Sequence, residues 1–282
     1  MTPVRLGAVG FLNARPCVVG LDRQPRFTLR FDMPSQCARL LHEGAIDAGL
    51  IPSIEYLRGP AARGRYSIVP GVAIASHGPV ASVALYTTRS MHDVRSIAMD
   101  TSSRTSVALV RVLCARRFGI DPSIEQSGPD LPAMLGRCDA ALVIGDNALL
   151  WDHTTVRLPA PTAVEGKPDT AHGHVEKIDL GETWMNLTGL PFVYAFWVGR
   201  ADALTRDDVA ILQHARDAGV RHPEQVARDY FGDSSLHAIG TRYLRDNIQY
   251  SLGDEELAGL ETFYRYAAEL GVVPTAGELR FY

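Results

Sequence analysis

The amino-acid sequence predicts an α/β fold of two lobes with a ligand-binding cleft between them. The chain has 282 residues, which exceeds what one hydrophobic core usually fills and suits two domains of ordinary size. Its composition, 46% hydrophobic and 21% charged, is that of a folded protein rather than of a disordered chain. Short apolar runs with strand character alternate with helical patterns, which is typical of α/β folds with mainly parallel strands.

The amino-terminal part is predicted to contain five strands and a helix. The helix is Pro34–Glu43, with a proline in its first turn and Gly44 at its end. The strands are the runs Val4–Val9, Phe27–Phe31, Ala45–Ile51, Ser67–Ala75 and Val80–Thr88. The last of these is the candidate hinge strand.

A second α/β unit is predicted to begin at Ile97. Its strands are Ile97–Met99, a run near Ile124, and the buried-looking run Ala140–Ile144, and a helix covers Thr105–Phe118. The segment His153–Glu176 is rich in Pro, Thr and His and shows no period, so it is predicted to be a loop.

The chain is predicted to return to the first unit at the strand Phe192–Val198. The chain after Thr205 has helical patterns, most clearly at Val209–Ala218 and Glu255–Leu270. The predicted lobes are therefore residues 1–88 with 190–282, and residues 89–189. A ligand is expected between them, where loops at the carboxyl ends of parallel strands converge.

The charge balance argues against polyanionic partners. The formal net charge is −4, and Lys and Arg form no continuous run, so neither nucleic acid nor an anionic membrane is expected as a partner. Asn13, Arg15 and Pro16 interrupt the apolar amino terminus, and no later stretch has the length of a membrane span. A cytoplasmic protein is expected, and its oligomeric state stays open.

Metal and nucleotide cofactors are not expected. His172 and His174 have no cysteine or acidic cluster beside them, and they are interpreted as solvated. The sequence has no Walker motif, no GxSxG and no GxGxxG after a strand. The cysteines lie far apart, without the spacing of a zinc site or a disulfide framework: Cys17, Cys37, Cys114 and Cys138.

The first candidate binding loop follows the first predicted strand. Asn13 offers both a donor and an acceptor to a ligand hydroxyl or carboxylate, and Arg15 is suited to clamp a carboxylate. The structural alternative is an asparagine that satisfies its own loop backbone beside a solvated arginine, and this loop alone favours that alternative.

The second candidate is the hydroxyl-rich turn Asp100–Ser106, between a predicted strand and a predicted helix. Ser103, Thr105 and Ser106 would add donors to the positive end of that helix, which suits an anion. A simple helix cap is the alternative, and the two interpretations remain about equal.

Four further residues stand at comparable positions. Gly145 and Asp146 follow the predicted strand Ala140–Ile144, and a helix cap is the plainer role for Asp146. Ser53 holds the equivalent place in the first lobe, as a cap or as a ligand contact. Ser82, early in the hinge strand, is hard to explain as a cap, although an ordinary strand residue remains the alternative.

A series of segments also carries a family resemblance. They are Arg5–Val9 with Phe11–Pro16, Pro34 and Ser35 with Gly44 and Asp47, Ile51–Tyr56, Val80–Leu85, Asp100–Ser106, Ile144–Asp146 and Asp179–Phe192. In this order they resemble the MqnA family of menaquinone biosynthesis, the chorismate dehydratases. The similarity covers most of the chain and is least distinctive in the carboxy-terminal helices.

The resemblance implies a fold like that of type II periplasmic binding proteins, and a reaction. Chorismate, a small dicarboxylate, would lose water to give 3-[(1-carboxyvinyl)oxy]benzoate in the futalosine route, without a cofactor. Asn13 and Ser82 stand where the family places its catalytic residues. The residues expected to bind the substrate are Arg15, Ser53, Ser103, Thr105, Ser106, Gly145 and Asp146.

The sequence offers no recognisable His or Lys base at these positions. The expected mechanism is therefore a substrate-assisted elimination, in which the side-chain carboxylate of chorismate takes the ring proton and the cleft supplies orientation.

Two other functions stay open at this point. One is the sister enzyme that makes 1,4-dihydroxy-6-naphthoate, for which a His base would be expected where this chain has Ile144–Asp146. The other is a non-catalytic protein that closes on a small carboxylate.

Overall fold

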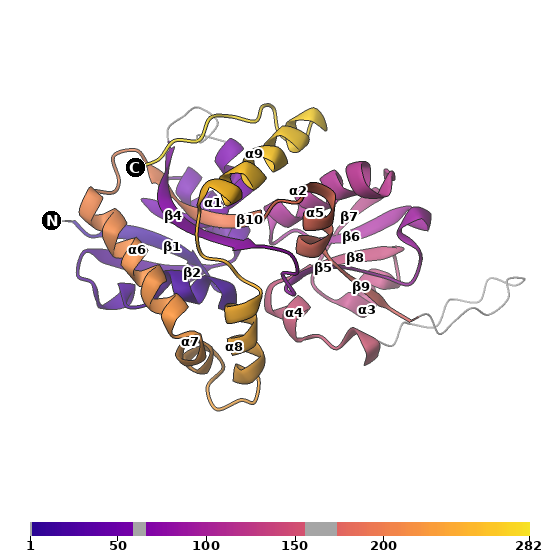
Figure 1. The fold of residues 1–282 in the computed structure, drawn as a ribbon, viewed down its shortest axis with the longest axis horizontal. Helices are drawn as coiled ribbons and strands as arrows, with labels where there is room; N and C mark the ends of the chain where they lie inside the picture. The colour runs from indigo at the N-terminus through magenta and orange to yellow at the C-terminus, as the bar shows by residue number, and fades with distance from the viewer. Residues whose placement is uncertain (1, 59–65, 156–173) are drawn as a thin grey trace, which may run out of the picture.

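The computed structural model describes residues 2–58, 66–155 and 174–282. Two α/β units lie side by side, and the first strand and the last helix belong to the same unit (Figure 1). Each unit is built on one five-stranded sheet.

The first sheet has the strand order β2-β1-β3-β10-β4. β1 runs parallel to β2 and β3, whereas β10 runs antiparallel to β3 and β4. The strands are β1 (Val4–Val9), β2 (Phe27–Asp32), β3 (Ala48–Pro52), β4 (Tyr66–Ser76) and β10 (Phe192–Arg200).

The second sheet repeats this plan in the order β7-β6-β8-β5-β9. β6 runs parallel to β7 and β8, whereas β5 runs antiparallel to β8 and β9. The strands are β5 (Val83–Thr87), β6 (Ser96–Asp100), β7 (Ser123–Ser127), β8 (Ala140–Ile144) and β9 (Glu176–Asp179).

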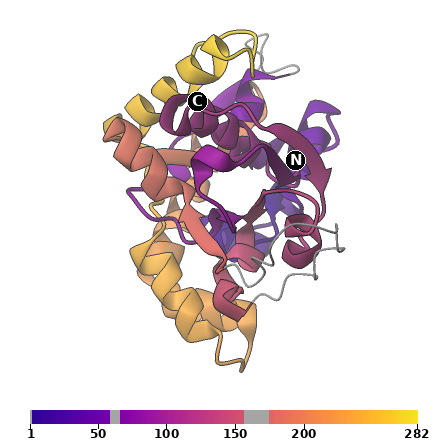
Figure 2. The same ribbon diagram turned by 90° about the vertical axis from the view of Figure 1, so that its right-hand side faces the viewer.

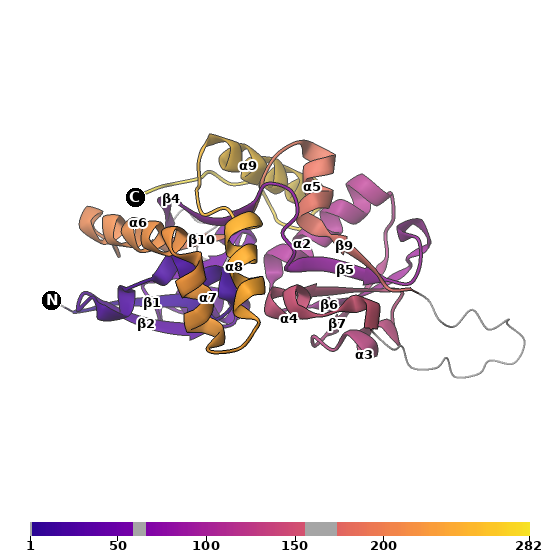
Figure 3. The same ribbon diagram turned by 60° about the horizontal axis from the view of Figure 1, so that its bottom comes forward.

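Helices cover the sheets and reach the boundary between the units. The carboxy-terminal helices, orange to yellow, lie along one side of the molecule (Figure 2), and α7 and α8 extend toward α4 of the other unit (Figure 3). The helices are α1 (Pro34–His42), α2 (Arg104–Leu113), α3 (Leu131–Leu135), α4 (Gly145–Leu150), α5 (Leu180–Thr188), α6 (Arg206–Arg221), α7 (Pro223–Phe231), α8 (His237–Asp246) and α9 (Asp254–Glu269). In the part of the chain that the structure covers, no helix combines the length and the apolar character that a membrane crossing requires.

The core of the first unit extends into α5, which precedes β10, and into α9, which follows it. Trp184 of α5 is fully buried, and its ring meets Phe192 edge to face at 5.3 Å and Phe263 of α9 at 6.1 Å. Such aromatic pairs stabilise beyond the area they bury. The chain therefore returns to the first unit through a packed aromatic cluster.

The α/β fold and most predicted elements are confirmed, but the prediction of mainly parallel strands was wrong. Four of the eight strand pairs among the described residues are antiparallel. All four involve β10 or β5, the strands that the chain enters on crossing from one sheet to the other. A strand entered from the opposite unit is not bound by the right-handed crossover that makes neighbouring strands parallel.

The chain changes sheets at two places. It crosses first at residues 77–82, since β4 belongs to the first sheet and β5 to the second, and it returns through α5 between β9 and β10. The predicted limit at residue 88 lies at the far end of β5. Most of the predicted loop His153–Glu176, including His172, lies outside the described residues, and β9 begins at Glu176.

Candidate functional site

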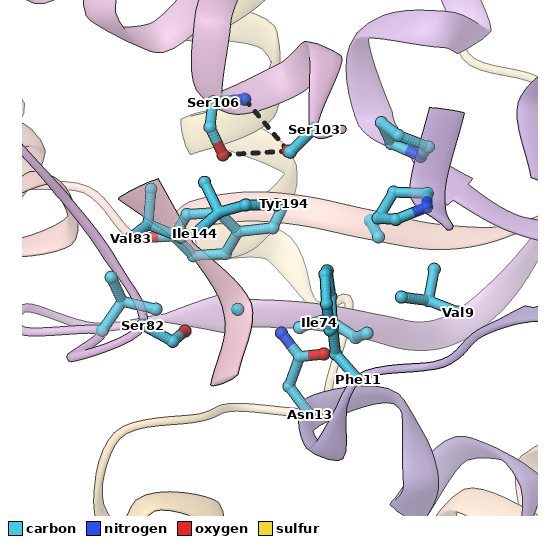
Figure 4. Close-up of a pocket in the computed structure, with 15 residues that line it drawn as sticks. Val9, Phe11, Asn13, Ile74, Ser82, Val83, Ser103, Ser106, Ile144 and Tyr194 are labelled. Carbon is cyan, nitrogen blue, oxygen red and sulfur yellow. Dashed lines mark hydrogen bonds between the residues drawn. The ribbon is translucent and has the colours of Figure 1, made fainter. Parts of the chain in front are cut away.

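A pocket lies where the loops after β1, β3 and β8, the start of α2 and the first crossing meet (Figure 4). It contains about 490 Å³ of empty space, part of which is open to solvent. The lining residues are Val9, Phe11, Asn13, Pro34, Pro52, Ile74, Val80, Ser82, Val83, Ser103, Ser106, Ile144, Gly145, Tyr194 and Ala195.

Asn13 presents an unsatisfied oxygen at this pocket. Its backbone is held by Tyr250, whose hydroxyl donates to the Asn13 carbonyl at 3.0 Å. Its side-chain Oδ1 is buried and has no hydrogen-bond partner among the described residues. A buried acceptor without a partner is costly, so the amide is well suited to a ligand. The loop-backbone alternative therefore does not account for this oxygen.

Ser82 is fixed by its backbone and by a tyrosine. It is 1% exposed, its carbonyl accepts from Gly145 N at 2.8 Å, and its Oγ lies 2.7 Å from the Tyr243 hydroxyl. The preceding Ala81 has a positive φ of 64°. Ala81 N donates to Asp179 Oδ2 at 2.6 Å, which holds this turn in place.

The side chains of the hydroxyl-rich turn Asp100–Ser106 point in two directions. Ser103 caps α2, and its Oγ lies 2.9 Å from Ser106 Oγ, with both residues on the pocket wall (Figure 4). Thr105 instead faces the first unit, where its Oγ1 accepts from Ile54 N at 3.2 Å and lies 3.4 Å from Ser53 Oγ. Ser103 is thus the predicted helix cap and also lines the pocket, while Ser53 and Thr105 contact each other.

Gly145 lines the pocket at a position where a side chain would not fit. Its φ is +64°, and a Cβ at this position would stand 2.9 Å from the Phe11 ring. An L-residue would be both strained and in collision with the ring. Phe11 and Gly145 therefore bring the two units into close contact at the pocket.

Asp146 and Arg15 lie beside the pocket, and each is held by other protein groups. Asp146 Oδ1 accepts from Leu12 N at 3.2 Å and Oδ2 accepts from the Tyr230 hydroxyl. Burial raises the pKa of Asp146 above its usual value. The Arg15 guanidinium stacks 4.1 Å from the Phe31 ring centroid and donates to the Gly10 carbonyl at 3.1 Å. Neither residue is part of the pocket lining.

Two tyrosines of the site were not predicted from the sequence. Tyr194 lines the pocket from β10, and its hydroxyl lies 3.1 Å from Ser76 Oγ, while burial raises its pKa well above the usual value. Tyr243 contacts Ser82 from α8. No local motif marks either residue, because each follows ordinary strand or helix patterning.

The pocket combines hydroxyls, an amide and apolar walls. Among its described lining residues there is no Asp, Glu, His, Lys or Arg. The α2 amino terminus supplies positive partial charge that favours an anion. No cluster of three His, Cys, Asp or Glu that could hold a metal ion occurs within the described residues. This arrangement can bind and orient an anionic ligand and exclude water around it.

Comparisons with known proteins find relatives over nearly the whole chain. A family model described as menaquinone biosynthesis matches residues 4–269. A chorismate dehydratase from Thermus thermophilus is 29% identical over 264 residues, covering 93% of this chain and 94% of that protein. A chorismate dehydratase from Campylobacter jejuni is 25% identical over 275 residues, covering 94% and 98%.

Solved structures establish the fold. A protein from Archaeoglobus fulgidus superposes with a TM-score of 0.71 at 14% identity, covering 96% of this chain and 98% of that one. An alkanesulfonate-binding protein from Xanthomonas axonopodis superposes with a TM-score of 0.67 at 18% identity, covering 98% and 96%. The expected likeness to periplasmic binding proteins is confirmed.

Proposed function

This chain belongs to the menaquinone biosynthesis family, and from that premise we propose that it is a chorismate dehydratase. Two curated relatives carry that name and align over nearly their whole length. Chorismate would lose its ring hydroxyl and a ring proton as water, and the ring would become aromatic in 3-[(1-carboxyvinyl)oxy]benzoate. The enzyme is then a carbon–oxygen lyase.

The observation that supports this function best is the composition of the pocket. It offers the free Oδ1 of Asn13, the hydroxyl of Ser82 and the Ser103–Ser106 pair. Among the lining residues that the structure describes, the phenol of Tyr194 is the one ionisable group. A substrate that carries its own carboxylate base needs orientation and water exclusion more than a protein base. The side-chain carboxylate of chorismate would take the ring proton.

We assign the polar groups of the pocket to separate tasks. Ser103 and Ser106, at the amino terminus of α2, would anchor one carboxylate, because hydroxyls and helix N–H groups together suit an anion. Asn13 and Ser82 would orient the departing hydroxyl and the enolpyruvyl group. Gly145 would contact the substrate through its backbone.

The remaining predicted substrate ligands have a supporting role in this proposal. Ser53, Thr105, Arg15 and Asp146 would hold the loops of the two units around the substrate, because their observed partners are protein groups.

The wider setting of the reaction is also part of the proposal. It includes the futalosine route, a cytoplasmic location and the use of no cofactor. The lobes predicted as residues 1–88 with 190–282 and residues 89–189 would close on the substrate, and the sheet pairing favours moving the first limit to residues 77–82.

The sister enzyme is not favoured. A histidine base was expected for it near Ile144–Asp146, and no histidine lines the described pocket. The curated relatives above are both named chorismate dehydratase.

The proposal is tested by incubating the purified protein with chorismate, without added metal or nucleotide. Loss of the diene absorbance and the mass of the product are followed together. Conversion over many turnovers supports the function. Binding without conversion would identify a carboxylate-binding protein instead, and the absence of both would also contradict the proposal.

Alanine substitution of the two proposed catalytic residues gives a sharper test. We expect Asn13→Ala and Ser82→Ala each to lower kcat by about a hundredfold or more, because orientation and hydrogen bonds in a closed site carry the rate. Thermal unfolding should change little. Asn186→Ala and Ser90→Ala, at exposed positions, are the matched controls. Near-normal kcat in both site variants would exclude the assignment.

A further inference from the structure

Tyr243 contacts the pocket residue Ser82 from an element that the predicted chemistry does not use. It lies on α8 in the first unit, is 2% exposed, and places its hydroxyl 2.7 Å from Ser82 Oγ. Gly240, one turn earlier, lets α8 approach the segment that carries Asn13, because a Cβ there would stand 3.0 Å from Leu12 Cδ2. Residues three apart share a helix face. The same face of α8 therefore contacts both catalytic loops.

The phenol of Tyr243 keeps its proton at neutral pH. Burial raises its pKa well above the usual value, and the Asp146 and Asp179 charges raise it further. The Ser82 and Asn13 side chains act in the opposite direction and lower this pKa. A neutral phenol has one proton to donate and an oxygen that accepts.

The 2.7 Å contact between the hydroxyls of Tyr243 and Ser82 fits either one as the donor. The Asn13 amide favours one direction, because its nitrogen can only donate to the phenolic oxygen. Figure 4 shows the Asn13 nitrogen on the side of Ser82 and its oxygen on the other side. If the Asn13 N–H occupies the phenolic oxygen as donor, the phenol O–H is free to donate to Ser82.

We propose that Tyr243 is a positioning residue of the dehydration, donating its hydroxyl proton to Ser82 Oγ so that the proton of Ser82 faces the substrate. This inference rests on the proposed function. In the resulting chain Asn13 donates to Tyr243, Tyr243 donates to Ser82, and Ser82 donates to the departing hydroxyl of chorismate. The free Oδ1 of Asn13 stays available as an acceptor in the pocket.

The alternative is a core tyrosine whose hydroxyl needs a partner only for stability. The two roles differ in what the loss of the hydroxyl changes. A positioning role acts on kcat through Ser82, whereas a purely structural role acts on thermal stability and leaves turnover intact.

The test is Tyr243→Phe, which removes only the hydroxyl. We expect kcat for chorismate to fall about tenfold to a hundredfold, with KM within about threefold of wild type, because a transition-state hydrogen bond is weakened while binding is kept. In the Ser82→Ala background the same change should have less than about a twofold effect, because Tyr243 acts through Ser82. Tyr66→Phe is the matched control, since it removes a buried hydroxyl that donates to Leu41 O at 3.1 Å, outside the pocket.

Folding of the Tyr243→Phe variant is checked by circular dichroism and by its affinity for the product, 3-[(1-carboxyvinyl)oxy]benzoate. A variant that binds product like wild type has an intact pocket, so its kcat is informative. If Tyr243→Phe has the kcat of the wild-type protein, the inference is overturned. The proposed function still stands in that case, because the wild-type protein converts chorismate. An equal loss in the Ser82→Ala background would also overturn it. An inactive wild-type protein would remove the proposed function and this inference together.

Discussion

Ala81 is the single non-glycine residue of the described chain with a positive φ, 64°. This conformation costs an L-residue about 1–3 kcal/mol and persists only where the surroundings enforce it. Here Ala81 N donates to Asp179 Oδ2 at 2.6 Å, and Ala81 O accepts from Lys177 Nζ at 2.9 Å. The strained residue immediately precedes Ser82, so the strain sets the direction of the proposed catalytic hydroxyl.

Two substitutions of Ala81 separate the effect of backbone strain from the effect of side-chain shape. We expect Ala81→Gly to keep wild-type kcat and to be neutral or stabilising by up to about 1 kcal/mol, since glycine adopts this φ without steric cost. Ala81→Val should lower kcat at least about tenfold, because a β-branched residue resists positive φ and would turn Ser82 away. Steady-state kinetics and thermal unfolding of both variants are the measurements. Equal kcat in the two variants would show that the turn does not position Ser82.

At the residue scale, the sequence predicts well which loops meet at the pocket. It predicts less well which of their side chains point into the pocket. Asn13, Ser82, Ser103, Ser106 and Gly145 line the pocket as the loops suggest. Thr105 and Ser106 are adjacent in sequence, yet one faces the first unit and the other the pocket, because successive helical residues point about 100° apart. This divergence is set by how α2 is rotated in the fold, which no local motif records.

Among the elements, α5 and its cap connect the two crossings between the sheets. Asp179 caps α5 by accepting from Gly181 N at 2.9 Å and Glu182 N at 3.1 Å. The same carboxylate accepts from Val80 N at 3.0 Å and from Ala81 N in the first crossing. One side chain thus satisfies four backbone donors in two segments that are about a hundred residues apart.

Asp179→Asn should weaken both segments at once. An amide has one acceptor oxygen where the carboxylate has two, so some of the four donors would lose their partner. We expect the free energy of unfolding to fall by about 1–3 kcal/mol and kcat to fall as well, because the turn before Ser82 is released. Asp130→Asn is the matched control, since Asp130 caps α3 through Ala133 N in an exposed position away from the pocket. An unchanged kcat in Asp179→Asn would contradict the link between α5 and Ser82.

Element prediction succeeded where periodicity and end signals agree and failed at the crossings. The helix α1 was predicted from Pro34 and Gly44, whose φ of +74° suits glycine at a helix end. α5 was not predicted as a helix, although Asp179 with Glu182 gives a cap signal, because the helix itself is only nine residues long. Val80–Ser82 was assigned to a strand, yet Ala81 makes it a turn, a conformation that depends on the distant Asp179.

Considered as a whole, the molecule closes its pocket with polar contacts between the two units on both sides. On one side Ser53 and Thr105 meet, and Ser35 N donates to Ser102 O at 3.1 Å. On the other side Asp146 contacts Leu12 and Tyr230. The existence of two lobes was predictable from chain length and alternating elements, whereas these contacts depend on the angle between the units. Sequence periodicity therefore cannot predict these contacts.

Glu55 is the most deeply buried charge at this boundary. Its side chain is 1% exposed, and its two oxygens bind Arg58 of the same unit at 2.9 Å and Arg104 of the other unit at 3.0 Å. Burial alone would raise the pKa of Glu55, but the His42 hydrogen bond and the charges of Arg104 and Arg58 outweigh it and lower the pKa overall. Arg104 begins α2, so this ion pair attaches the proposed anion-binding helix end to the first unit.

Glu55→Gln should weaken the contact between the two units more than it destabilises either unit. The neutral amide leaves two arginines without a carboxylate, and we expect a loss of about 1–3 kcal/mol in unfolding free energy with a severalfold rise in KM for chorismate. Solution X-ray scattering of the ligand-free variant should give a larger radius of gyration than wild type. Glu43→Gln is the control, because Glu43 pairs with Arg39 in an exposed i,i+4 contact with both side chains 52% exposed.

The pH dependence gives the same test a second readout. Because the folded-state pKa of Glu55 lies below its unfolded value, near 4.3, its ion pairs contribute fully above that pH and are lost as the pH falls through the folded pKa. The stability difference between wild type and Glu55→Gln should therefore shrink as the pH is lowered from about 6 to below 4. Urea unfolding across this range measures it. A difference that stays constant, or a Glu55→Gln variant with wild-type KM and scattering, would mean that the Glu55–Arg104 contact does not hold the units together.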